Sequence, residues 1–77
     1  MVSKRTIRNR VSQIKLDIGI RLCLLREERE MSLEEVAEAC GISACRIKMI
    51  EDGRSFSLKH LFMLASVYGV RVKILFE

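Results

Sequence analysis

Residues 31–53 read MSLEEVAEACGISACRIKMIEDG, and two short helical patterns meet within this stretch at a glycine. Ser32 precedes the first pattern and Glu35 follows three residues later, which is the spacing of a capping box at the start of a helix. Gly41 comes just after this pattern, where a helix often ends in the left-handed conformation that glycine adopts readily. The stretch therefore predicts a short capped helix that ends at a tight turn.

A second short helix is predicted after the turn. Ser43 is suited to cap it, and Ile47 and Ile50, three residues apart, lie on one of its faces. The turn at Gly41 leaves too little chain for antiparallel helices, so we expect the two helices to cross steeply. The small side chain of Ala37 allows a close approach.

This layout is that of a helix-turn-helix, and its residues resemble those of the phage-repressor/Cro-like (XRE) family of DNA-binding domains. The similarity extends from about Gly19 to Gly69. The matching residues are Arg26, Ser32, Glu34, Glu35, Val36, Ala37, Gly41, Ile42, Ser43, Ile47, Ile50, Glu51 and Gly53. The resemblance implies an all-α, repressor-like domain of four to five helices that binds double-stranded DNA. A generic bundle of capped helices is the alternative.

The chain is small and basic. Its 77 residues suffice for one domain, and its net charge of +4 suits an anionic polymer as partner. The three cysteines are odd in number and fall on helical patterns, so we expect a reducing, cytoplasmic setting rather than disulfides. No apolar run approaches the roughly 20 residues of a membrane span, and none follows the basic N-terminus as in a secretory signal.

Catalysis, cofactors and metal binding are not expected. Cys40 and Cys45 are five residues apart, without a C-x-x-C spacing, and the one histidine, His60, is distant in the sequence. No nucleophile is paired with a base, and no glycine-rich phosphate loop occurs. These features favour a binding protein over an enzyme.

Residues 1–16 form a basic segment in which Ile7, Val11 and Ile14 recur at helical spacing. Two alternatives, which can both hold, describe this segment. One is an added helix that packs on the domain or on a second copy, and the other is a basic arm that follows DNA phosphates. The arm would contact phosphates through Arg5, Arg8 and Arg10.

Residues 17–69 are expected to form the helix-turn-helix domain. We expect Asp17 to cap its first helix, which runs to Glu30. The family usually has glycine at this end, so the helix must close without that glycine cap. The family also links its first and third helices by an ion pair, and the resemblance assigns this role to Arg26 and Glu51.

The C-terminal stretch 70–77 reads VRVKILFE and begins with alternating apolar and polar residues, which predicts a β-strand. No second strand is predicted, and a lone strand leaves its backbone groups unpaired. We therefore expect it to pair with its counterpart in a second copy, as in some antitoxin-type members of the family. A frayed tail that lies on the core is the alternative. The apolar residues of this dimerisation strand are Val70, Val72, Ile74 and Phe76.

The second helix of the motif is expected to enter the major groove, as it does in this family. The resemblance assigns base contacts to Ala44, Cys45, Arg46 and Lys48, of which only the arginine and the lysine are strong hydrogen-bond donors. Leu33 replaces a glutamine that commonly contacts phosphate in the family, which removes one positioning contact. The candidates for phosphate contact are Ser43, Arg54, Ser57 and Lys59. The alternative is helix capping by the two serines and ordinary solvation of the two basic residues.

Three functions are compatible with these features. The favoured one is a sequence-specific transcriptional regulator, a repressor that binds palindromic DNA as a homodimer. The second is an antitoxin that neutralises a toxin protein and regulates its own promoter with the same domain. The third is a helix-turn-helix kept as a protein-interaction module without DNA binding.

Overall fold

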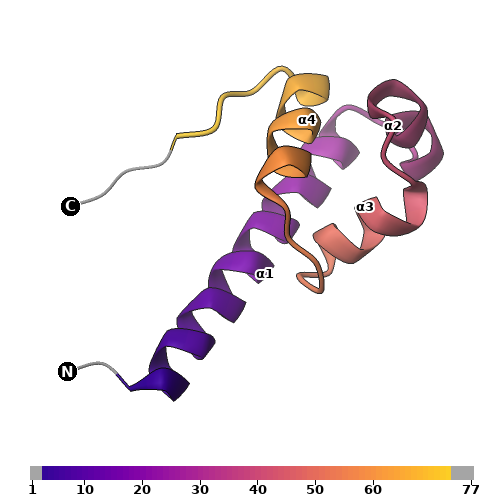
Figure 1. Ribbon diagram of the computed structural model, residues 1–77. Helices are drawn as coiled ribbons and strands as arrows, with labels where there is room; N and C mark the ends of the chain where they lie inside the picture. Colours follow the sequence, from indigo (N-terminus) through magenta and orange to yellow (C-terminus); the bar gives the residue numbers. More distant parts are fainter. Residues whose placement is uncertain (1–2, 74–77) are drawn as a thin grey trace.

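Four helices make up the part of the chain that the structure, a computed structural model, describes, residues 3–73 (Figure 1). They are α1 (Lys4–Glu28), α2 (Leu33–Cys40), α3 (Ala44–Glu51) and α4 (Leu58–Tyr68). Because these residues contain no strand, the prediction of an all-α domain is confirmed for them. None of the four helices is both long and apolar enough to cross a membrane.

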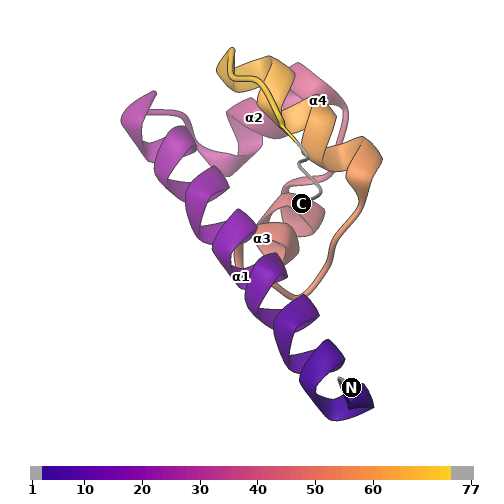
Figure 2. The ribbon, with the colours of Figure 1, turned by 90° about the vertical axis from the view of Figure 1, so that its left-hand side faces the viewer.

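The first helix is one continuous element, and the expected helix start at Asp17 is wrong. α1 begins after Ser3, whose hydroxyl accepts a hydrogen bond from the amide of Thr6 at 3.2 Å. Asp17 lies in mid-helix, where its carboxylate accepts a hydrogen bond from the Gln13 side chain at 2.8 Å. Nothing in the sequence between residues 4 and 28 breaks a helix, and its apolar stripe passes through Asp17 without a shift in register. The N-terminal segment is therefore helical, and it extends beyond the rest of the molecule (Figures 1 and 2).

The caps predicted for the helix-turn-helix are present. Ser32 and Glu35 exchange two hydrogen bonds, from the Ser32 amide to the Glu35 carboxylate at 2.9 Å and from the Glu35 amide to the Ser32 hydroxyl at 3.1 Å. The bond from the Ser32 amide, and next the Ser32 side chain, lower the pKa of Glu35. Gly41 ends α2 with φ at 78°. The hydroxyl of Ser43 then accepts from the amide of Arg46 at 3.1 Å, which starts α3. Local sequence thus fixes both ends of the turn.

The end of α1 differs from expectation, because it keeps the left-handed cap without a glycine. Glu30 has φ at 53°. Its amide donates to the carbonyl of Glu27 at 3.0 Å, and the amide of Met31 donates to the carbonyl of Arg26 at 3.2 Å. This is the Schellman pair of hydrogen bonds. A left-handed residue with a Cβ costs about 1–2 kcal/mol, which the two bonds offset.

The core lies where the four helices meet. Val36, Ile47 and Leu64 are fully buried, and each comes from a different helix. Leu22 of α1 and Tyr68 of α4 complete the centre of this cluster. Within this core α3 packs mainly against α1 and α2.

Two close contacts tie α1 to the rest of the domain. A Cβ built on Gly19 would lie 2.5 Å from the backbone oxygens of both Ile50 and Glu51, so the backbones of α1 and α3 touch here. At the other end of α1, Arg29 donates to the carbonyl of Tyr68 at 2.9 Å and stacks over its ring, 5.8 Å from the centroid. These contacts hold α3 and α4 against one helix.

The strand predicted for residues 70–77 is not seen in residues 70–73, the part of this stretch that the structure describes. Residues 70–73 have no regular secondary structure, and residues 74–77 lie outside the described part. Val70 instead packs against the core, and its amide donates to the carbonyl of Ala65 at 3.0 Å. Among residues 3–73 no neighbouring strand offers the pairing that a strand requires.

Candidate nucleic-acid interface

The orientation of α3 follows from which of its residues are buried. Ile47 and Ile50 have 0% and 3% of their surface exposed, and Glu51 beside them has 5%. Because α-helical residues repeat about every 3.6 positions, these three fix one face of α3 against the core. The opposite face must then point to solvent.

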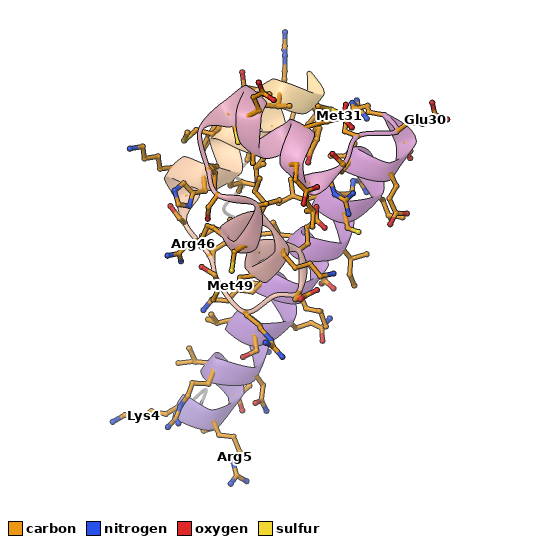
Figure 3. The ribbon with its side chains drawn as sticks, turned by 90° about the vertical axis from the view of Figure 1, so that its right-hand side faces the viewer. Lys4, Arg5, Glu30, Met31, Arg46 and Met49 are labelled. Carbon is orange, nitrogen blue, oxygen red and sulfur yellow. The ribbon has the colours of Figure 1, made fainter. Side chains whose placement is uncertain are left out.

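The exposed ridge of α3 is formed by Cys45 and Met49, which are four residues apart. Arg46 and Lys48 are also exposed, one on each flank of this ridge. Ala44 is half-buried, so it contributes less to the surface than its neighbour Cys45. Figure 3 shows α3 toward the viewer, with Arg46 and Met49 on its near side. The surface is apolar along its centre and cationic on its flanks.

Both cationic side chains of this surface have partners. Arg46 donates to the hydroxyl of Ser55 at 3.0 Å, which directs its guanidinium toward the loop after α3. The ammonium of Lys48 lies 3.4 Å from the carboxylate of Asp52, one turn further along the helix. An exposed pair of this kind is worth about 0–1 kcal/mol, so a DNA partner can replace it easily.

The ion pair expected between Arg26 and Glu51 links α1 to α3. Nε and Nη2 of the arginine donate to the two carboxylate oxygens at 2.8 and 3.1 Å. Nη1 donates to the carbonyl of Met31 at 3.0 Å. The carboxylate is 1% exposed, and its hydrogen bonds raise the pKa of Arg26 above its ordinary value. Loss of one partner would leave a buried charge, at a cost of about 3–5 kcal/mol.

The residues assigned to phosphate contact fall into two groups. Near α3, Ser43 is its exposed N-cap, Arg54 is exposed in the loop after it, Lys59 is exposed on α4 and Ser57 is the half-buried N-cap of α4. The hydroxyl of Ser57 accepts from the amide of His60 at 3.3 Å. The second group, Arg5, Arg8 and Arg10, lies on the part of α1 that extends past the body, with Lys4 and Arg5 near its tip (Figure 3). The structure does not bring the two groups together.

Comparison with known protein families matches residues 24–75 to a family described as helix-turn-helix. The chain belongs to the XRE type of the helix-turn-helix family. No curated protein and no solved structure gives a match. The family is one of DNA-binding regulators, and this helix-turn-helix protein is a DNA-binding regulator of the XRE type. The core-facing side of α3 and the link from α1 to α3 agree with that assignment.

Sequence reasoning missed three features of this helix-turn-helix. The partnership of Lys48 with Asp52 has a sequence signal, since residues four apart on a helix are neighbours. The hydrogen bond from Arg46 to Ser55 has no sequence signal, because the path of the loop after α3 sets the position of the Ser55 hydroxyl. The close approach of α1 and α3 at Gly19 also has no sequence signal, since an isolated glycine within a helical pattern does not reveal which element it faces.

Proposed function

We propose that this helix-turn-helix protein is a sequence-specific transcriptional repressor that binds palindromic operator DNA as a homodimer. The observation that carries the proposal is the exposed outer face of α3, which Ile47 and Ile50 orient and which has cationic flanks. A helix presented in this way fits the major groove of B-DNA. A repressor acts by occupying its operator, so it needs no further domain for that step.

The chemistry of this face suggests how bases are read. Cys45 and Met49 offer apolar contact to thymine methyl groups, while Arg46 and Lys48 offer donors to guanine O6 and N7. Ala44 is too recessed to contribute more than a methyl contact. We therefore expect thymine near the centre of each half-site and few direct hydrogen bonds, so that DNA shape contributes to specificity.

The homodimer is proposed from the symmetry of palindromic sites and from the C-terminal stretch. In the single chain Val70 packs on the core and residues 70–73 have no regular secondary structure, so a strand containing Val72, Ile74 and Phe76 would require pairing with its counterpart in the second copy. Two α3 helices related by a two-fold axis would then occupy successive major grooves, about 34–36 Å apart.

Selection of bound sequences from a random DNA pool tests the proposal directly. Lys48→Ala should weaken binding to the best site by about 1–3 kcal/mol and relax preference at one base position. If Lys48 contacts only phosphate, binding to all sequences should weaken alike. Lys73→Ala is the matched control, because Lys73 is exposed and belongs to the tail, which lies on the other side of the molecule from α3 (Figure 1). A chain that binds no sequence of the pool would contradict the proposal.

A second variant tests the role of the Lys48–Asp52 pair. Asp52 is 42% exposed on the same face, where its carboxylate competes with DNA for Lys48 and repels phosphate. Asp52→Asn should therefore tighten binding to the selected site several-fold. Asp17→Asn, which removes an exposed carboxylate from α1, should change it much less.

A further inference from the structure

A stripe of exposed apolar side chains runs along the part of α1 that extends past the body. Ile7, Val11 and Ile14 are 51%, 45% and 57% exposed. Their spacing of four and three places them on the helical face that carries Ile18 and Leu25 one and three turns further on, where the helix meets α4. The stripe thus continues the apolar face by which α1 packs on the other helices, but in the part of α1 that extends past them no other helix covers it.

The same face continues into an open groove of about 500 Å³ between α1, α4 and the tail. Its walls include Ile18 and Leu25 of α1, Leu58 and Leu61 of α4, and Val72 of the tail. Leu58 is 49% exposed, and Phe56, which also lines the groove, is 40% exposed. Stripe and groove together form one apolar surface, which we call the α1–α4 face.

The charged residues around the α1–α4 face are almost all basic. The groove is lined by Arg21, Arg71 and Lys73 against a single acidic residue, Asp17. Along residues 4–26, α1 has seven basic residues and only this one acidic residue. The first turn of α1 contains basic but no acidic residues, which opposes the helix dipole. A negatively charged occupant would reduce the repulsion among these basic residues and would interact favourably with the start of α1.

This charge distribution distinguishes between occupants of the face. A second copy docked by the same stripe would place basic residues against basic residues in either direction, since α1 has no acidic residue before Glu27 except Asp17. A bilayer surface is flat, and it would not follow the concave groove to Ile18 and Leu25. An amphipathic helix fits a concave apolar groove and an apolar stripe at heptad spacing.

We propose that the α1–α4 face binds an acidic amphipathic helix of a partner protein. Apolar residues of the partner would pack on Ile7, Val11 and Ile14 and enter the groove. Its acidic residues would pair with the basic residues on both edges, among them Lys15 and Arg21. The tail lies on the side of the molecule that faces the viewer in Figure 2, and α3 lies toward the opposite side, which faces the viewer in Figure 3. No residue of α3 lines the groove. Partner and DNA can therefore bind together, and this inference does not rest on the proposed repressor function.

Two synthetic peptides test the proposal on the full chain. Both are helices of about five turns with leucine at the a and d positions, one with glutamate and the other with lysine beside the leucines. We expect the glutamate peptide to bind, by fluorescence anisotropy, at least tenfold more tightly than the lysine peptide. Val11→Ser with Ile14→Ser should weaken its binding at least tenfold.

The matched control variant carries Ile20→Ser and Leu24→Ser. These side chains are 49% and 50% exposed on other faces of the same helix, so they match the stripe in exposure and in helical context. The control should change peptide affinity less than twofold. Lys15→Glu with Arg21→Glu should reverse the preference between the two peptides, which a loss of folding cannot do.

Four outcomes would overturn the proposal. The first is that both peptides bind with equal affinity, and the second is that the stripe and control variants change peptide affinity equally. The third is self-association in sedimentation equilibrium that the stripe variant abolishes. The fourth is binding to phosphatidylglycerol vesicles that the stripe variant abolishes, without binding of either peptide. The proposal would also be contradicted if the tail of the same chain closed the groove. In that case the full chain would bind neither peptide, and a chain ending at Lys73 would bind the glutamate peptide.

Discussion

Glu30 is a residue whose conformation suits glycine better than glutamate. Its φ of 53° places it in the left-handed region, at the end of α1. Glu30→Gly should therefore raise the free energy of unfolding by about 0.5–1 kcal/mol, because the gain in backbone fit exceeds the added entropy of the unfolded chain. Urea denaturation measures the change.

The control for Glu30 is Glu28→Gly. This change removes the same charge two residues earlier, in a helical position, and should lower stability by about 1 kcal/mol. If both glycine variants destabilise the protein alike, the left-handed conformation of Glu30 contributes no strain in solution.

Tyr68, the one tyrosine of the chain, should make stability fall in strong alkali. Burial, and next the negative charge of Glu51, raise its pKa to about 12. In the unfolded chain a tyrosine titrates near 10. The folded state therefore holds this proton more tightly, so its contribution is complete below about pH 10 and is lost as the pH rises to about 12. The absorbance of the phenolate follows the titration directly.

The variant Tyr68→Phe separates the loss of stability caused by ionisation of Tyr68 from any loss caused by other groups that titrate in alkali. The Tyr68 hydroxyl is buried and has no hydrogen-bond partner among residues 3–73, so its removal should cost little at neutral pH. The variant should then lose less stability than the parent between pH 10 and 12. A phenolate midpoint near 10 in the folded protein would contradict the structure.

At the scale of helices, the contact of α1 with α3 depends on the missing side chain at Gly19. Glycine to alanine within a helix normally stabilises it by about 0.5–1 kcal/mol. Here the added Cβ would lie 2.5 Å from two backbone oxygens of α3, and backbone cannot yield as a side chain does. We expect Gly19→Ala to lower the melting temperature, with an overpacking cost of about 1–3 kcal/mol.

Ser12→Ala provides the comparison for Gly19. Ser12 is exposed on the same helix, so alanine there should stabilise slightly through its higher helix propensity. A melting temperature that rises in both variants would mean that α1 and α3 do not touch at Gly19.

The extended part of α1 should add affinity for DNA without sequence preference. Arg5, Arg8 and Arg10 are exposed and distant from the face of α3, so they can reach phosphates outside the bases that α3 reads. Each phosphate that a basic residue neutralises adds about 0.9 to the slope of log affinity against log salt. Replacing the three arginines with glutamine should flatten this slope and leave the selected sequence unchanged. A shifted sequence with the same slope would show that the segment reads bases.

For the whole molecule, the proposed dimer can be tested by shortening the tail. A chain that ends at Lys73 keeps Val70, which packs on the core, and loses the apolar residues Ile74 and Phe76. It should sediment as a monomer and bind a single half-site. Its helical circular dichroism should be unchanged, because the four helices end at Tyr68. An unchanged dimer after truncation would exclude the tail as the dimer contact.

The sequence by itself determined the local elements of this protein. Caps and turns depend on hydrogen bonds within four residues, so Ser32, Glu35, Gly41 and Ser43 were sufficient to place α2, the turn and α3. Helical periodicity likewise determined which face of α3 is buried, because Ile47 and Ile50 define it without reference to their neighbours.

Only the tertiary structure decided what each face meets. The stripe of α1 is continuous in sequence, yet Ile18 and Leu25 in its C-terminal half are partly buried by the other helices and its N-terminal half is exposed, because α1 extends past those helices. The same holds for Gly19 and for the partners of Arg46 and Lys48. Periodicity says which residues share a face, whereas the packing of distant segments sets what covers that face.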